Sequence, residues 1–256
     1  MNHIKQLQEG PSVRGLKKMT AAAFGALALM SAAAPAMADV INFESIGSAT
    51  FDGKDVFAEN GYSMTVLDSP ASSSGTGFAG AVGNGSDPYL CAIAACPTGN
   101  GSYFYMGVND GGLKVAREDN TAFRLFSLNY AFLPPVGGLP SDSYGMLTVV
   151  GQTVAGGSAL ATFRFPLLDG DGNSPFKIAG LKAAFGDTQF SSVTISSCLW
   201  SDSGSCVNPA GNQAQFAFDN LLLAPVPEPT TYAMMGLGLA AIGLVSRRRA
   251  KKQANA

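Results

Sequence analysis

The four cysteines lie in two local pairs, CAIAAC and CLWSDSGSC, and an even number of closely spaced thiols indicates disulfides in an exported protein. Three connectivities are possible, and loop closure favours bonds between neighbours. The sequence therefore predicts two short disulfides, Cys91 with Cys96 and Cys198 with Cys206. A metal site built from all four thiolates would need paired C-x2-C spacing, which the sequence does not have.

The only histidine is His3, at the N-terminal end of the chain. Without another histidine, the rest of the chain cannot build Ser-His-Asp or Cys-His catalysis, or a histidine-ligated metal site. The GxSxG and HExxH motifs and a Walker loop are also absent. Two carboxylates about 5 to 10 Å apart could cleave a glycosidic bond, but no local motif singles out such a pair. We therefore expect a protein that is not an enzyme and has no catalytic residue.

The N-terminal segment has the three parts of a secretory leader in the right order. Lys17 and Lys18 precede the apolar run MTAAAFGALALMSAAA, and the A-x-A site formed by Ala36 and Ala38 follows it. Such a segment is a signal peptide that signal peptidase removes. We predict a signal helix over residues 1–38 and export of the remaining chain across the inner membrane.

The C-terminal segment combines a Pro-Glu-Pro motif, an apolar run and a basic cluster. The apolar run from Thr231 to Val245 has 15 residues, fewer than the roughly 17 to 25 of an ordinary spanning helix. Because arginines are retained on the cytoplasmic side, we expect transient membrane anchoring with the body outside. The predicted parts are a linker at 225–230, a short transmembrane helix at 231–246 and a basic cytoplasmic tail at 247–256.

This tail resembles the PEP-CTERM sorting domain of Gram-negative bacteria. The residues that carry the resemblance are Val226, Pro227, Glu228 and Pro229, followed after the apolar run by Arg247, Arg248 and Arg249. The resemblance implies recognition by an exosortase, a membrane-embedded enzyme that cuts near the motif and delivers the body to the cell surface or extracellular matrix. Such systems accompany exopolysaccharide production and biofilm formation. Gln215, Phe216 and Asp219 also fit the Q-F-x-x-D pattern of one PEP-CTERM subfamily.

The body between the two signals is acidic. Residues 39–229 contain 17 Asp and Glu against 7 Lys and Arg, a net charge near −10, whereas the whole chain is near −2. An acidic surface repels phosphate backbones, so we expect no nucleic-acid partner.

Short β-branched and aromatic runs, separated by segments rich in Gly, Asn, Asp and Pro, dominate the body. This pattern predicts an all-β fold, a single β-sandwich or jelly-roll-like domain over residues 39–224. The Ser- and Gly-rich range 68–97 is expected to be a long surface insertion. The eight predicted strand runs are 40–44, 62–67, 102–108, 122–132, 146–151, 161–167, 192–200 and 215–223.

Two further sites are predicted within this domain. In many carbohydrate-binding jelly rolls the first and last strands pair, and a Glu and an Asp there hold a structural calcium, which prefers oxygen ligands. By analogy Glu44 and Asp219 are candidate calcium ligands, although Asp219 and Asn220 could equally cap a strand through hydrogen bonds.

Trp200, the sole tryptophan, lies inside the Cys198 to Cys206 loop. Its ring could stack on a sugar or could simply pack.

Together these features predict an exported, exosortase-sorted protein of the cell surface or extracellular matrix. We expect a non-enzymatic structural or adhesive component linked to exopolysaccharide or biofilm. The alternative is a calcium-stabilised module that binds, or less readily cleaves, an extracellular polysaccharide.

Overall fold

The computed structural model describes residues 38–69, 77–87, 96–134, 145–181, 183–200, 205–207, 214–226 and 229–254. Residues 36–226 form one compact unit, to which the C-terminal helix does not belong. The two are therefore described separately. Residues 1–37 of the predicted signal peptide, which include Ala36, lie outside the described residues, and Ala38 immediately precedes the first strand.

Antiparallel strands make up almost all of the regular structure of the body, as the alternation of apolar runs and turns predicts. Each of the eight predicted runs overlaps a strand, namely β1, β4, β6, β8, β9, β10, β12 and β14. The strands of the described residues are β1 (Asp39–Ile41), β2 (Ala49–Asp52), β3 (Val56–Glu59), β4 (Tyr62–Leu67), β5 (Phe78–Asn84), β6 (Tyr103–Gly107), β7 (Gly112–Arg117), β8 (Phe123–Phe132), β9 (Met146–Thr153), β10 (Ser158–Arg164), β11 (Lys177–Gly180), β12 (Phe190–Trp200), β13 (Cys206–Val207) and β14 (Phe216–Pro225).

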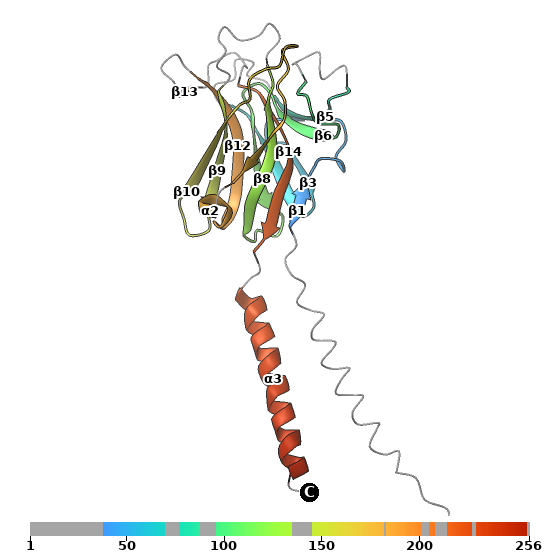
Figure 1. Ribbon diagram of the computed structural model, residues 1–256, viewed down its shortest axis with the longest axis vertical. Coiled ribbons are helices and arrows are strands. Elements are labelled where there is room, and N and C mark those ends of the chain that lie inside the picture. The colour runs from blue at the N-terminus through green and yellow to red at the C-terminus, as the bar shows by residue number, and fades with distance from the viewer. Residues whose placement is uncertain are drawn as a thin grey trace, which may run out of the picture. The chain divides into compact units, whose positions relative to one another are not determined.

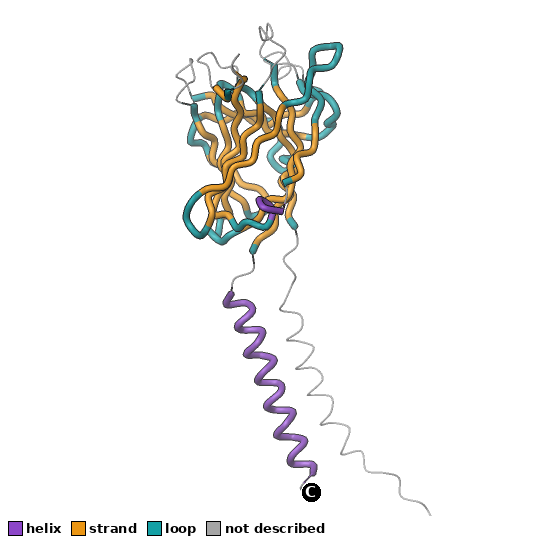
Figure 2. The backbone as a smooth tube through the Cα atoms, turned by 60° about the vertical axis from the view of Figure 1, so that its left-hand side comes forward, coloured by secondary structure: helices purple, strands orange, loops and turns teal. Residues whose placement is uncertain are grey.

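These strands form one curled sheet with two halves (Figures 1 and 2). The β3 half has the order β3, β4, β7, β12, β9, β10. The β14 half has the order β2, β5, β6, β14, β8, β11, with β1 also paired to β14. The halves join where Phe190 of β12 pairs with Phe123 of β8. The all-β prediction is confirmed, but the strands belong to one continuous sheet and not to two separate ones.

The larger of two apolar clusters fills the space between the halves. Strand β4 alternates buried and partly exposed residues, so that Tyr62, Met64 and Val66 all face inward. The Tyr62 ring meets Phe123 edge to face, with centroids 5.5 Å apart, which is a favoured aromatic geometry. A second, smaller cluster that includes Phe104 and Met106 packs beneath Phe176 on the β14 half. Packing on both faces makes the β14 half the more enclosed part of the sheet.

One strand lies where the sequence predicts a long insertion. The segment FAGAVGN, which forms β5, falls within the range 68–97. Its small residues leave room for large neighbours, because a Cβ atom at Gly80 would collide with the Tyr105 hydroxyl group. The insertion prediction is therefore wrong for residues 78–84.

The C-terminal segment forms the helix α3 (Pro229–Ala254), and a four-residue helix, α2 (Ala183–Gly186), lies in the body. Proline suits the first position of a helix, and the Ala-, Leu- and Met-rich sequence after it favours helix formation. The predicted transmembrane helix over 231–246 is corrected, because no helix among the described residues is long and apolar enough to cross a membrane. The apolar stretch is short, and α3 continues through the arginines that follow it.

Candidate functional site

Asp219 lies in the middle of the central strand β14, where the register against β8 shifts between Asp219 and Leu222. The next residue, Asn220, has a left-handed backbone with φ of 51°, a conformation that Asn tolerates better than most residues. Such an irregularity changes the direction in which the neighbouring side chains point. The Asp219 side chain is fully buried.

The Asp219 carboxylate is surrounded by hydrogen-bond donors. Asn100 Nδ2 donates to Oδ2 at 2.8 Å, and Ser102 Oγ donates to the same oxygen at 3.0 Å. The backbone N–H of Asn220 donates to Oδ1 at 2.6 Å. Burial raises the pKa of the Asp219 carboxyl, these hydrogen bonds oppose the rise, and the nearby charge of Glu44 adds to it. Asn100 and Ser102 were not predicted as site residues; the turn sequence Asn-Gly-Ser before β6 is the signal that marks them.

Glu44 is exposed just after β1, and its Oε1 accepts a hydrogen bond from the backbone N–H of Tyr103 at 2.9 Å. The two predicted calcium ligands are bridged by adjacent residues, because Ser102 donates to Asp219 and Tyr103 donates to Glu44. Their oxygens, however, already accept hydrogen bonds from N–H and O–H groups. Among the described residues there is no group of three or more His, Cys, Asp or Glu that could hold a metal. Calcium at Glu44 and Asp219 stays a prediction, while the capping alternative matches the bond from Asn220 to Asp219.

A second buried carboxylate, Glu59, holds the chain segment between β1 and β2. Its Oε2 accepts a hydrogen bond from Phe43 N at 2.9 Å, and its Oε1 accepts one from Ser45 Oγ at 2.8 Å. Phe43 is fully buried with φ of 61°, which is unusual for a bulky residue. Glu59 thus secures a strained aromatic residue close to Glu44. Sequence reasoning missed this contact, because only the Asn-Gly turn that follows Glu59 marks the position.

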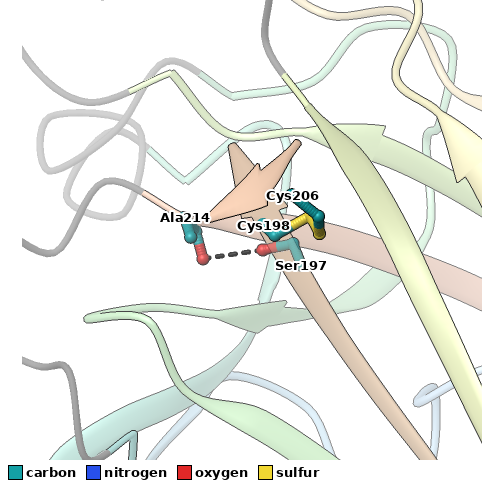
Figure 3. Close-up of a disulfide and its surroundings, with 4 residues drawn as sticks. All are labelled: Ser197, Cys198, Cys206 and Ala214. Atoms are coloured by element: carbon teal, nitrogen blue, oxygen red, sulfur yellow. Dashed lines mark hydrogen bonds between the residues drawn. A yellow bond between two sulfur atoms is a disulfide. The ribbon is translucent and has the colours of Figure 1, made fainter. Parts of the chain in front are cut away.

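The predicted disulfide between Cys198 and Cys206 is confirmed and joins the end of β12 to β13, with Cα atoms 5.5 Å apart. Figure 3 shows it beside the hydrogen bond from Ser197 Oγ to the Ala214 carbonyl oxygen, at 2.7 Å. Cys96 is also disulfide-bonded. Its predicted partner, Cys91, lies outside the described residues.

Trp200 is the last residue of β12 and is partly exposed. The guanidinium carbon of Arg164, from β10, lies 5.0 Å from the centroid of the Trp200 ring, a cation–π contact. The predicted aromatic candidate is thus part of a Trp–Arg pair on the β3 half. Its role in glycan binding stays a prediction.

The predicted sorting signal is described only in part. Val226 N donates to the Ala122 carbonyl oxygen at 2.9 Å, which ties the end of β14 to the body. Pro227 and Glu228 lie outside the described residues, and Pro229 begins α3. Arg247 and Arg248 are exposed on α3, and Arg249 continues the helix.

Comparison with known families identifies the tail. Residues 225–249 match the PEP-CTERM protein-sorting motif. This motif implies an exported protein that is processed by an exosortase and sorted to the cell surface in Gram-negative bacteria. The match leaves out Gln215, Phe216 and Asp219, on which the predicted Q-F-x-x-D subfamily depends. No curated protein matches the chain.

Two solved structures resemble part of the fold. One contains the CBM22-1 and GH10 modules of endo-1,4-β-D-xylanase 10B from Clostridium thermocellum, complexed with xylohexaose. The sequence identity is 12% and the TM-score is 0.31, and the match covers 74% of this chain but 28% of that one. The other is the CBM22-1 xylan-binding domain of Xyn10C from Paenibacillus barcinonensis, with 10% identity, a TM-score of 0.30, and coverage of 76% of this chain and 99% of that one.

Proposed function

We propose that the chain is an exported, surface-sorted β-domain that serves as a non-enzymatic structural or adhesive component of the extracellular polysaccharide matrix. The sorting motif at residues 225–249 is the observation that carries this proposal. A stable body delivered by such a motif needs no catalytic site to act as a matrix component. The continuous sheet and its single large core supply a rigid body of that kind.

Deletion of residues 226–256 tests the delivery step in the native host. We expect the truncated protein to move from the surface fraction to the culture medium or another wrong compartment. The matched control removes only residues 250–256, which lie beyond the motif match, and should fractionate like the intact protein. Unchanged fractionation of the longer deletion would contradict sorting by this tail.

A calcium-stabilised glycan-binding module is the second candidate. The specific observation in its favour is that neighbouring residues contact both carboxylates: Ser102 Oγ donates to Asp219 Oδ2, and Tyr103 N donates to Glu44 Oε1. A bound cation would relieve the repulsion between the two carboxylates. Co-sedimentation with the host's own exopolysaccharide, with and without chelator, tests binding and its dependence on calcium. Release of reducing ends in the same assay would replace both candidates with a glycan-cleaving enzyme.

A further inference from the structure

The outer side of the β3 half carries a row of hydroxyl groups at matched register. Thr162 of β10 lies opposite Thr148 of β9, which lies opposite Ser196 of β12. One row further, Thr194 of β12 lies opposite Lys114 of β7. These residues alternate with core residues such as Val149 and Ile195, so their side chains point away from the core. We call the set Thr148, Thr162, Thr194, Ser196, Lys114 and Arg164 the hydroxyl face.

The hydroxyl groups of this face are available to a partner. In the part of the chain that the structure describes, the side chains of Thr148, Thr162, Thr194 and Ser196 make no hydrogen bond to another protein group. Thr162 is exposed and the other three are partly exposed. A sheet surface with unengaged donors and acceptors suits a ligand that is itself rich in hydroxyl groups.

The charge of the face is opposite to that of the body. The strands β4, β7, β9, β10 and β12 contain no Asp or Glu, although residues 39–229 carry a net charge near −10. Lys114 and Arg164 are both exposed on the face. The one salt bridge among the described residues joins Arg117 to Asp119. Neither Lys114 nor Arg164 is therefore neutralised by a salt bridge there. The face is thus a cationic surface on an acidic protein.

The two cations are held far apart. Arg164 of β10 pairs with Met146 of β9, which in turn pairs with Cys198 of β12. Lys114 lies on the other side of β12, on β7, and pairs with Thr194, four residues before Cys198. Standard strand geometry separates their Cα atoms by about 20 Å. The contact with the Trp200 ring restricts the position of the Arg164 guanidinium. This lowers the entropy lost when Arg164 binds an anion. A partner that touches both cations must be extended.

We propose that the hydroxyl face binds an extended anionic polysaccharide, whose acidic groups pair with Arg164 and Lys114 while its hydroxyl groups bond to the Thr and Ser side chains between them. The proposal rests on the proposed function, for which it names the chemical class of the matrix partner. Arginine pairs with a planar carboxylate through two parallel hydrogen bonds, and lysine acts as a point charge. The same chemistry would accept a carboxylated or a sulfated polymer.

The test measures binding of the full-length protein to three polymers: alginate, which carries carboxylates, dextran sulfate, and neutral dextran. We expect binding to at least one anionic polymer, weaker at high salt, and none to dextran. Changing both Arg164→Gln and Lys114→Gln should raise the dissociation constant about tenfold. The matched control, Lys54→Gln with Lys177→Gln, removes the same charge from exposed residues elsewhere and should bind like the wild type. Trp200 fluorescence provides a second readout, since the chain has one tryptophan.

Three results with the polymers would overturn the proposal, and one result with vesicles would do so as well. The results with the polymers are no binding to either anionic polymer, equal binding to dextran, and equal loss in both double variants. Capture by phosphatidylglycerol vesicles through Arg164 and Lys114, without capture by the polymers, would instead assign the face to a membrane surface and also overturn it. None of these results bears on surface delivery, because the tail deletion measures that step by fractionation. Failure of the face and failure of sorting are thus separate observations.

Discussion

Asn100 Nδ2 lies 2.8 Å from Asp219 Oδ2, although 119 positions separate the two residues in the chain. Because Asp219 is fully buried, its removal leaves the side chain of Asn100 and the backbone N–H of Asn220 without this acceptor. Unpaired donors shielded from water are costly, so we expect Asp219→Ala to lower the free energy of unfolding by about 3 kcal/mol. Urea denaturation at neutral pH measures this change.

Asp171→Ala is the control for that prediction. Asp171 is an exposed acidic residue in the turn after β10, and its removal changes the net charge equally. We expect its effect to stay within about 0.5 kcal/mol. If Asp219→Ala cost no more than this control, the Asp219 network would not stabilise the body.

The calcium candidate makes a prediction of its own at Glu44 and Asp219. If a calcium ion binds there, a chelator should lower the melting temperature by several degrees, because the ion stabilises only the folded state. Glu44→Gln should abolish that sensitivity, since glutamine keeps an acceptor for Tyr103 N but removes a charged ligand. Differential scanning calorimetry with and without chelator measures both effects. An unchanged melting temperature of the wild type would remove calcium from the site.

The disulfide between Cys198 and Cys206 closes a short loop, with a sequence separation of 8. The double change Cys198→Ser and Cys206→Ser should therefore cost about 2 to 3 kcal/mol through the greater freedom of the unfolded chain. Trp200 fluorescence should also change, because the disulfide holds the end of β12, where the ring meets Arg164. Chemical denaturation monitored at the single tryptophan gives both quantities. An unchanged spectrum would show that Arg164 and Trp200 stay together without the disulfide.

Local sequence information predicts those parts of the structure that local interactions determine. The run FRLFSLNYAF forms β8, and the spacing of Cys198 and Cys206 gives their bond, because the signal for each lies in neighbouring residues. The strand β5 could not be predicted in this way. Its Gly and Ala residues have low strand propensity, and Gly80 is there because Tyr105 packs against it.

The contacts of the candidate site depend on tertiary pairing. Asp219 and Glu44 could be singled out as carboxylates at the two ends of the domain. Their hydrogen-bond partners, from Asn100 to Tyr103, are brought to them by the pairing of β6 with β14. The end of α3, in contrast, is determined by local propensity. The sequence predicts that the helix ends before the arginines, but Arg, Lys and Ala are good helix formers and extend it to Ala254.

The Asp119 carboxylate should make the stability of the folded protein depend on pH in the acidic range. Its Oδ2 lies 2.8 Å from Arg117 Nη2, and its Oδ1 accepts hydrogen bonds from the N–H and hydroxyl groups of Thr121. The hydrogen bond from Arg117, followed by that from the Thr121 backbone, holds the pKa of the Asp119 carboxyl well below its usual range. A lowered folded-state pKa stabilises the protein above the ordinary Asp value of about 3.9, and that stabilisation is lost as the pH falls through the folded-state pKa.

Asp119→Asn isolates this charge, because the amide oxygen can still accept from Thr121. The side chain is 49% exposed, so solvent screening limits the expected loss to about 1 kcal/mol or less at pH 7. The difference from the wild type should shrink steadily as the pH falls below about 4. Urea denaturation at a series of pH values measures it, and Glu118→Gln, the same charge change at the next position, should show no such trend. A difference that persisted undiminished down to pH 2 would assign the effect to packing and not to the Asp119 charge.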